Sequence, residues 1–382
     1  MPEIYLDHAA TTPISPAVRA GMQPYLEGRF GNPSSRHPHG VRAREAVEEA
    51  RLRVARATGS RPENVVFTAG GTEANNLAVL GLARARRRSG GRVLVGPTEH
   101  ASVRESARAL GEEGFEVETL RLDASGDLDL EHLARALTQD TVLVACMLVN
   151  NEFGTVYPVE RVARIVRAGA PGARLHVDAV QGIGKLPVSL GELGAHSLSI
   201  SAHKIHGPKG SGALVLADGV KPRPLVHGGG QEHGLRSGTE NVAGCVGLGL
   251  AAEAAAERVG ERGAELLRLR ELLRRELEPL AGARLLDPGA ARSPAIAAVL
   301  LPGPPAEVWM HHLETRGVYA SVGAACQGKR GGVAPALKAL GLDDEQARHV
   351  LRLSFSRSTT EDEIRGAALV LAEIERELGV AG

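Results

Sequence analysis

The sequence predicts an α/β protein in which helices cover both faces of a mostly parallel, seven-stranded sheet, with a smaller α+β domain beside it. Between residues 64 and 216, short runs rich in Val, Ile and Leu alternate with longer Ala-rich runs, the pattern of parallel strands joined by helices. After Gly238 the alternation stops and a long stretch of Ala, Leu, Glu and Arg begins. The 382 residues are too many for one simple core. We therefore expect a large domain of residues 14–250 and a small domain of residues 1–13 and 251–382.

The elements of the large domain follow in chain order. An apolar piece begins at Ile4 and leads into a turn of small residues, and helices are expected at 16–27 and 40–58. The strands of the sheet are predicted at residues 64–68, 93–96, 115–122, 141–149, 175–178, 198–201 and 213–216. The helices between them are predicted at residues 72–88, 101–113, 128–137 and 158–168.

The small domain is predicted from the remaining patterns. Its expected parts are one long helical stretch at 245–280, an apolar run at 295–301, a helix near 306–316, a Gly-rich stretch at 323–332, a strand at 350–355 and a last helix. Thr360 and Glu363 have the spacing of a capping box, so the last helix should begin there.

Composition and charge exclude several classes of function. Lys plus Arg and Asp plus Glu both number 45, so nothing indicates a general nucleic-acid or anionic-membrane binder. No apolar run is long enough to span a membrane, and the N-terminus lacks the pattern of a signal peptide. The three cysteines are scattered and do not suggest a disulfide framework, which fits a reducing, cytoplasmic location.

Lys204 is the first candidate for chemistry. The predicted strand at 198–201 runs directly into Ser201-Ala-His-Lys204, which places Lys204 at the carboxyl end of a strand. Open α/β sheets hold their ligands at that edge. A lysine there can stay charged in solvent, or it can be desolvated and act as a nucleophile or base. Considered alone, Lys204 is more simply interpreted as solvated.

Three further motifs follow predicted strands. Gly71 and Thr72 open a helix after a strand, where free N–H groups suit a phosphate, although this is also an ordinary strand–helix turn. Asp178 ends a strand and can either cap a helix or hold a protonated pyridine nitrogen. His100 can either cap a helix or stack on a planar ring.

Two other positions suggest ligand contacts. Asn150 and Asn151 follow a strand and fit either a turn or a pair of amide donors. Arg352 lies in the otherwise apolar strand predicted at 350–355, and a buried guanidinium needs a planar anionic partner. That partner can be a substrate carboxylate or an internal ion pair, and the sequence leaves both open.

The cysteines differ in their surroundings. Cys326 lies in a Gly-rich segment next to Lys329 and Arg330, where nearby cations favour the nucleophilic thiolate. Cys146 lies in a predicted strand and Cys245 in an apolar helix start, so both are expected to be inert packing residues.

These candidates together predict a cofactor. A lysine, a carboxylate, an aromatic histidine, a phosphate turn and an amide cluster all follow strands of one sheet. Pyridoxal phosphate needs a Schiff-base lysine, a partner for its pyridinium nitrogen, a stacking ring and a phosphate site.

At these residues the chain closely resembles the cysteine desulfurases of the NifS/IscS type, which are class V aminotransferase-like enzymes of fold type I that use pyridoxal phosphate. The resemblance runs almost from end to end, and several motifs in the family's order are more specific than any one alone. The matching segments are 5–13, 31–35, 71–73, 98–100, 150–152, 177–181, 201–204, 207–210, 236–239 and 352–354.

The resemblance implies a role for each site residue. Lys204 would carry the cofactor and move the substrate Cα proton, His100 would stack on the ring and shuttle a proton, and Cys326 would take the sulfur. Asn151 and Arg352 would hold the substrate carboxylate. The implied cofactor-binding residues are Gly71, Thr72, His100, Asn151, Asp178, Gln181, Ser201, His203, Lys204 and, from the other subunit of a homodimer, Thr239.

The implied reaction converts L-cysteine to L-alanine and leaves the sulfur on Cys326 as a persulfide. A sulfur-acceptor protein would then carry it toward iron–sulfur clusters, thio-cofactors or tRNA. The family usually has Ser-Gly-Ser-Ala-Cys-Thr-Ser at the nucleophile, whereas residues 321–328 here read Ser-Val-Gly-Ala-Ala-Cys-Gln-Gly. Cysteine and loop length are kept, and the loop is expected to be mobile.

Other interpretations remain. A selenocysteine lyase or another class V aminotransferase-like enzyme would share the fold and the cofactor. A nucleotide-binding loop matches residues 323–329 until Arg330 stands where Ser or Thr should hold the metal. A metal site built on His pairs is weaker, because no cysteine or carboxylate lies at ligand spacing, so we expect no metal.

Overall fold

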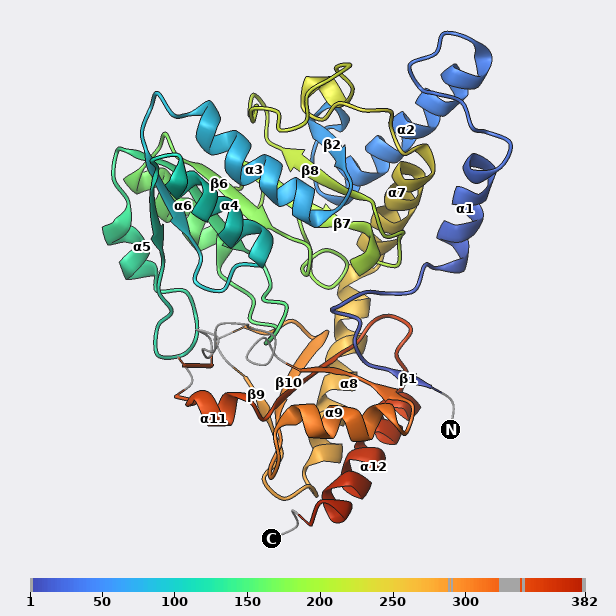
Figure 1. Cartoon of the computed structure of the whole chain (residues 1–382), viewed down its shortest axis with the longest axis vertical. Coiled ribbons are helices and arrows are strands. Elements are labelled where there is room, and N and C mark those ends of the chain that lie inside the picture. Colours follow the sequence, from blue (N-terminus) through green and yellow to red (C-terminus); the bar gives the residue numbers. More distant parts are fainter. Residues whose placement is uncertain (1–2, 288, 290, 323–336, 339–340, 380–382) are drawn as a thin grey trace.

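A computed structural model describes residues 3–287, 289, 291–322, 337–338 and 341–379 (Figure 1). A seven-stranded sheet occupies the upper half of the view, and a four-stranded sheet lies below it. No helix among the described residues is long and apolar enough to cross a membrane.

The large sheet confirms the predicted α/β class. Its strand order is β2-β8-β7-β6-β5-β3-β4, and all neighbours are parallel except β8, which runs antiparallel to both β2 and β7. The strands are β2 (Val65–Thr68), β3 (Arg92–Val95), β4 (Glu116–Thr119), β5 (Thr141–Met147), β6 (Arg174–Asp178), β7 (Ser197–Ser201) and β8 (Gly212–Leu216).

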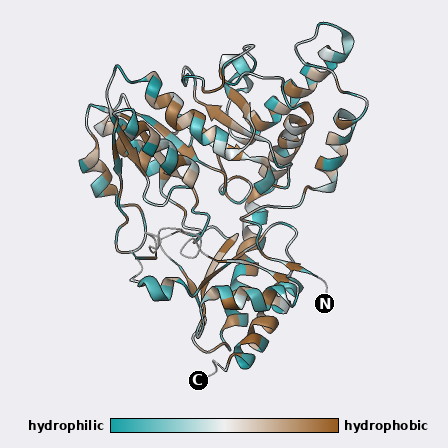
Figure 2. Cartoon of the chain, viewed as in Figure 1, coloured by the Kyte–Doolittle hydropathy of each residue, from teal (hydrophilic) through white to brown (hydrophobic). Residues whose placement is uncertain are grey.

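Both faces of this sheet are buried, which explains the continuous apolar runs in its central strands. In β5, Val144 packs into one hydrophobic cluster and Leu143 into another on the opposite face. Figure 2 shows the apolar residues concentrated on these strands and the polar residues on the outer helices. Helices α3 (Gly71–Ala85) and α4 (Ala101–Glu112) cover the Leu143 face. The helices that pack on the Val144 face are α1 (Pro16–Leu26), α2 (Pro38–Ala57), α5 (Leu130–Ala136), α6 (Val159–Gly169) and α7 (Val242–Ala256).

The small sheet has the order β12-β13-β10-β9 and is antiparallel. Its hydrophobic cluster includes Trp309 and Phe355, both almost fully buried. Its strands are β9 (Arg284–Leu286), β10 (Ile296–Leu300), β12 (Ser321–Val322) and β13 (Val350–Ser354). The nearby helices are α8 (Val259–Leu277), α9 (Ala306–Glu314), α11 (Asp344–Ala347) and α12 (Glu361–Glu377).

The first residues of the chain pack with this second half of the molecule. Strand β1 (Ile4–Tyr5) pairs in parallel with β11 (Val318–Tyr319), and Asp7 forms a bridge with Ser354. The N-terminal segment therefore lies between the two sheets. The boundary expected at residues 250 and 251 falls inside α7, and the division into two domains stays a prediction.

The long helical stretch predicted at 245–280 is wrong, because the chain forms two helices there. The break lies at Glu257 and Arg258, and Arg258 adopts a left-handed backbone conformation with φ of 55°. The break separates α7, which is buried against α1 and α2, from α8, which packs against α12 beside the small sheet. A composition rich in helix formers throughout cannot indicate this change of direction.

Two smaller expectations had different outcomes. The capping box at Thr360 and Glu363 is confirmed, since each side chain bonds the other's backbone N–H. The short elements β9, β11, β12 and α11 were not predicted, because runs of two to four residues carry almost no periodic signal.

Candidate active site

A cavity of about 490 Å³ lies where β6 and β7 end, between the two sheets. Residues from the N-terminal segment and from β13 complete its wall. The residues singled out from the sequence that line it are Gly71, Thr72, His100, Asn151, Asp178, Gln181, Ser201, His203, Lys204 and Arg352. The expectation that strand ends gather these side chains is therefore correct.

Lys204 stands at the end of a short 3-10 turn that follows β7 directly. Its Nζ donates to the carbonyl oxygens of Ala9 and Ala10, at 2.6 Å each. Burial, together with the positive charge of Arg352, lowers the pKa of Lys204 to about 8, although Asp7 and Asp178 oppose the shift. The desolvated interpretation of this lysine therefore replaces the solvated one.

Asp178 is the last residue of β6 and is only 5% exposed. Its Oδ2 accepts from Asn75 Nδ2 at 2.7 Å, and its Oδ1 accepts from the backbone N–H of Val180 at 3.0 Å. Burial raises the pKa of Asp178, and these two hydrogen bonds oppose the rise. Asp178 is thus a buried carboxylate that faces the cavity without a hydrogen-bonded cationic side chain among the described residues.

Asn75 belongs to the site but was missed in the sequence. Its Oδ1 accepts from His176 Nε2 at 3.0 Å and from the hydroxyl of Ser199. His176 is fully buried, and burial lowers its pKa to about 3, so its ring is neutral. Because Oδ1 of Asn75 accepts from these two donors, the amide is oriented with its Nδ2 toward Asp178. A polar residue on the buried side of α3 was the available signal, because helix interiors disfavour Asn.

His100 both caps a helix and lines the cavity. Its Nδ1 accepts from the backbone N–H of Ser102 at 3.1 Å at the start of α4, and the Ser102 hydroxyl lies 2.8 Å away. Because Nδ1 accepts, the neutral ring carries its proton on Nε2. Burial is the main cause that lowers the pKa of His100. Asn75 also donates to the Ser102 hydroxyl at 2.8 Å, so hydrogen bonds connect Asp178 with His100.

Arg352 forms an internal ion pair, one of the two interpretations that the sequence left open, and it also lines the cavity. Its Nη2 forms an ion pair with Asp7 Oδ1 at 2.7 Å, and its Nη1 donates to the carbonyl oxygen of Asn151 at 2.9 Å. The guanidinium still lines the cavity, and its buried Nε has no partner among the described residues. The arginine is therefore held in place at the wall of the cavity by Asp7 and the Asn151 carbonyl.

The opposite end of the cavity suits a phosphate. Gly71 and Thr72 form the first turn of α3, and no side chain caps that helix from Gly70. The positive end of the helix dipole therefore faces the cavity. Ser201 and His203 lie beside it, and burial lowers the pKa of His203 to about 4.

One predicted residue lies away from this cavity, and another lies outside the described residues. Thr239 is exposed and does not line it. Cys326 lies outside the described residues, as does the nucleotide-binding loop considered at 323–329. Cys146 and Cys245 are buried as expected, and burial raises the pKa of each thiol. Within the described part of the chain, no group of three or more His, Cys, Asp or Glu side chains is arranged to hold a metal.

The comparisons with known proteins agree with this geometry. Residues 4–366 match the family described as aminotransferase class-V. The chain is 39% identical over 377 residues to the cysteine desulfurase IscS of Dictyoglomus turgidum, across 98% of this chain and 95% of that one. It is similar to the solved structure of a NifS-like protein, with a TM-score of 0.92, 36% identity and coverage of 98% and 100%. A structure of SspA in complex with cysteine has a TM-score of 0.79 at 31% identity, with coverage of 92% and 98%.

Proposed function

This chain belongs to the class V aminotransferase family, and from that membership we propose that it is a pyridoxal-phosphate-dependent cysteine desulfurase that converts L-cysteine to L-alanine. The observation that carries the proposal is the meeting of Lys204, Asp178, His100 and Arg352 in one cavity. The similarity to proteins named cysteine desulfurase over nearly the whole chain supports the reaction.

The residues of the cavity fit the cofactor. Asp178 is a buried carboxylate in need of a positive charge, which a pyridinium nitrogen supplies. His100 would stack on the ring, and Gln181 would contact its hydroxyl. The phosphate would be held by Gly71, Thr72, Ser201 and His203, with Lys204 as the covalent attachment. When bound, the cofactor provides an electron sink for negative charge at the substrate Cα.

The protein's own groups would then move the protons. Lys204 would remove the substrate Cα proton, and its lowered pKa makes the neutral amine accessible near neutral pH. Arg352, fixed by Asp7 and the Asn151 carbonyl, would bind the substrate carboxylate. This contact would orient the Cα–H bond toward Lys204.

We assign sulfur transfer to Cys326 from its place in the sequence. Its thiolate would attack the substrate sulfur, so that an S–S bond forms as the Cβ–S bond breaks. The electron pair of the broken bond stays with carbon and is protonated, which gives alanine and a persulfide on Cys326. The burial of Cys146 and Cys245 supports this choice, because a thiol with a raised pKa is a poor nucleophile.

The test is the substitution Cys326→Ala. The variant should fold, bind pyridoxal phosphate and change its visible spectrum when L-cysteine is added, since Lys204 acts before the thiol. Persulfide on the protein should disappear, and alanine release should collapse. Persulfide labelling with mass mapping after one turnover and an alanine assay would measure both.

Cys245→Ala is the matched control and should retain persulfide formation. Full alanine production by Cys326→Ala, or sulfur mapped to Cys146 or Cys245, would overturn the assignment. Such a result would favour a selenocysteine lyase or another enzyme of the family.

The homodimer, the sulfur acceptor and the cytoplasmic location belong to the proposal as well. Thr239 lies outside the cavity of its own chain, so a contribution to the phosphate would have to come from a second copy. The acceptor is proposed to be a protein that meets the persulfide of Cys326. Sedimentation of the purified protein would test the dimer, and fractionation of cells would test the location.

A further inference from the structure

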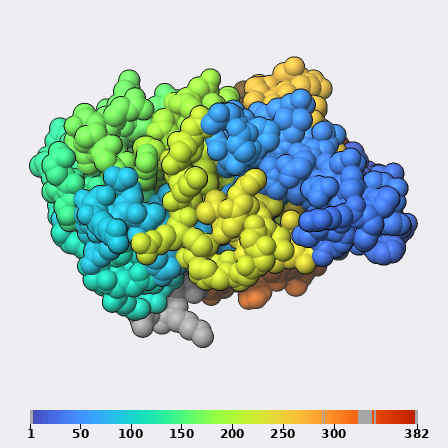
Figure 3. Space-filling view, turned by 90° about the horizontal axis from the view of Figure 1, so that it is seen from above, coloured from blue at the N-terminus to red at the C-terminus, as the bar shows by residue number. Residues whose placement is uncertain are grey.

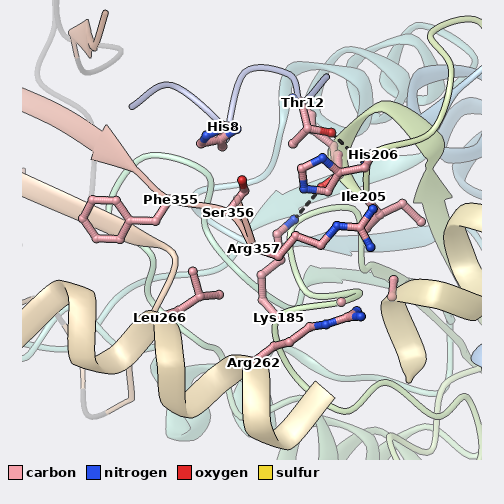
Figure 4. A pocket seen from close by; sticks show the side chains of 13 residues that line it. His8, Thr12, Lys185, Ile205, His206, Arg262, Leu266, Phe355, Ser356 and Arg357 are labelled. Atoms are coloured by element: carbon pink, nitrogen blue, oxygen red, sulfur yellow. Dashed lines mark hydrogen bonds between the residues drawn. The ribbon is translucent and has the colours of Figure 1, made fainter. Parts of the chain in front are cut away.

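A second, smaller cavity lies behind the turn that carries Lys204. Its volume is about 40 Å³, and it is bounded by the N-terminal segment, that turn, α8 and the end of β13 (Figure 4). Apart from Lys204, none of the predicted cofactor and substrate residues lines this cavity. It borders both halves of the molecule.

The side chains around this small cavity carry only positive or titratable basic charge. Lys185, Arg262 and Arg357 line it, together with His8 and His206, and no carboxylate does. Among the described residues, Lys185, Arg262 and Arg357 have no ion-pair partner. The residues outside the described part contain no Asp or Glu, so no acidic side chain remains there to neutralise them.

The cations are held toward the cavity by backbone oxygens. Lys185 Nζ donates to the carbonyl oxygen of Lys204 at 3.1 Å, and Arg262 donates to the carbonyl oxygen of Ala254. Figure 4 shows the Lys185 amine below the His206 ring, with the guanidinium groups of Arg262 and Arg357 beside it. Besides burial, the charges of Arg357, Lys185 and Arg262 all lower the pKa of His206, and the charge of Arg262 also lowers the pKa of Arg357.

A buried polar atom in this cavity lacks a partner. His8 is 6% exposed, and its Nδ1 makes no hydrogen bond among the described residues. His206 Nδ1 donates to the carbonyl oxygen of Pro13 at 3.0 Å, so Nε2 is the unprotonated nitrogen of this neutral ring and donates to no ligand. A buried polar group without a partner is costly, and, besides burial, the charge of Lys185 is close enough to lower the pKa of His8. The unpaired Nδ1 of His8 therefore indicates that a small polar group is missing from this cavity.

The space limits the size of that ligand. A water needs roughly 10–15 Å³ of such volume, so about 40 Å³ accepts a group of only a few atoms. We propose that this cavity binds a small inorganic anion, with chloride as the simplest case, between Lys185, Arg262 and Arg357. The bound anion would offset part of the positive charge of the three cations and connect α8 and the segment after β13 to the turn below Lys204.

Bromide provides a direct test, because it replaces chloride and scatters anomalously. Crystals of the holoenzyme soaked in sodium bromide should show an anomalous peak between Lys185 and Arg262. In solution, adding the holoenzyme should broaden the chloride-35 nuclear magnetic resonance signal. Adding bromide should reverse this broadening. Removing one charged donor should weaken halide binding roughly tenfold or more.

The informative variants are Lys185→Met and Arg262→Gln, and Arg268→Gln is their control. Arg268 is an exposed arginine on the same helix that does not line this cavity. The first two variants should lose the chloride-35 broadening, and the control should keep it. If Lys185→Met does not fold, Arg262→Gln still decides the outcome, because its side chain is only half-buried.

Stability provides an independent measurement. At equal ionic strength, the thermal midpoint of the wild-type holoenzyme should be higher in sodium chloride than in sodium gluconate, and Arg262→Gln should show no such difference. The absence of a bromide peak in the cavity, or equal broadening in wild type and Arg262→Gln, would overturn the proposal.

The dependence on pH has a definite sign. Burial, reinforced by the charge of Lys204, lowers the pKa of Lys185 to about 7. Only the protonated amine attracts an anion, so halide affinity should be highest below pH 7 and fall as the pH rises above it. The charged and titratable groups that face Lys185 are His8, Lys204, His206, Arg262 and Arg357. The two histidines have pKa values of about 4 and therefore stay neutral through this range.

Discussion

Asn75 controls how the buried carboxylate of Asp178 faces the cavity. Its amide orientation is set by His176 and Ser199, which both donate to Oδ1. The opposite end of the amide therefore donates to Asp178 and to Ser102. A hydrogen bond to the charged form of a carboxylate favours ionisation, so Asn75 offsets part of the effect of burial on the Asp178 pKa.

This role predicts the effect of Asn75→Ala. Without the amide donor the pKa of Asp178 should rise, and the ionised carboxylate needed for a pyridinium should be lost at a higher pH. A hydrogen bond to a charged group contributes about 1.5–3 kcal/mol, which corresponds to roughly one to two pH units. The acid limb of the kcat profile should therefore move upward by that amount.

Asn76→Ala is the control, since Asn76 follows directly on α3 and donates to the Thr72 and Ser102 carbonyls instead. Profiles of kcat against pH for the two variants would separate the roles. Identical acid limbs would show that Asn75 only supports the fold.

At the level of single residues, the sequence predicts which polar residues lie at strand ends. It does not predict which buried side chains from different elements form hydrogen bonds. Lys204, Asp178 and His100 follow apolar runs, so their gathering at one edge was predictable. The partners of Asn75 lie 101 and 124 residues away, on β6 and β7. Nothing in one sequence indicates which buried polar residues from distant elements will meet.

At the level of elements, the break between α7 and α8 has an energetic signature. Arg258 adopts the left-handed conformation, which costs a side-chain-bearing residue about 1–2 kcal/mol. Its exposed ion pair with Glu261 offsets little of this cost, because surface ion pairs contribute about 0–1 kcal/mol to stability. This backbone conformation changes the direction of the chain between α7 and α8.

Arg258→Gly should therefore raise the thermal unfolding midpoint, with a gain of up to about 1 kcal/mol, because glycine adopts this conformation readily. The same change at Arg268, inside α8, should lower the midpoint by about 1 kcal/mol, since glycine is unfavourable in a helix interior. Scanning calorimetry of the two variants would measure the contrast. A loss of stability in both would mean that Arg258 contributes contacts beyond its backbone conformation.

The strand positions and the mostly parallel class of the large sheet were predicted, and the order of its strands was not. All seven strand positions were found from their β-branched apolar runs, and the parallel class followed from the alternation with helices. The antiparallel direction of β8 was not predicted, because a buried strand has the same composition in either direction.

At the scale of the whole molecule, the exposed segment around Thr239 is the part of the chain that we propose completes the site of a second copy. It lies on the face shown in Figure 3, in yellow, next to the N-terminal helices in blue. The segment is held by a buried ion pair in which Nη1 and Nη2 of Arg51 each donate to a carboxylate oxygen of Glu232 at 2.8 Å. A fixed, exposed segment is a suitable surface for a second copy of the chain.

Thr239→Ala should accordingly weaken the retention of pyridoxal phosphate by about 1.5–3 kcal/mol, the contribution of one hydrogen bond to a charged group. Equilibrium dialysis of the variant against free cofactor would measure the loss. Thr119→Ala, at an exposed position on β4, is the control and should bind the cofactor normally. A fully active monomer at high dilution would contradict a shared site.

The position of the N-terminal segment has a consequence for biosynthesis. Asp7 pairs with Arg352 and Ala9 bonds Ser354, each across 345 residues of chain. When the segment leaves the ribosome, its partners have not yet been translated. The contacts of Asp7 and Ala9 with β13 can thus form only after β13 has emerged, near the end of translation. The partners of the Ala9 carbonyl oxygen, Gln181 and Lys204, are translated earlier. The large sheet can assemble earlier, whereas the cavity between the sheets closes late, since contacts so distant in sequence form slowly. A nascent chain that stops short of β13 would leave the side chain of Asp7 and the backbone N–H of Ala9 without these partners.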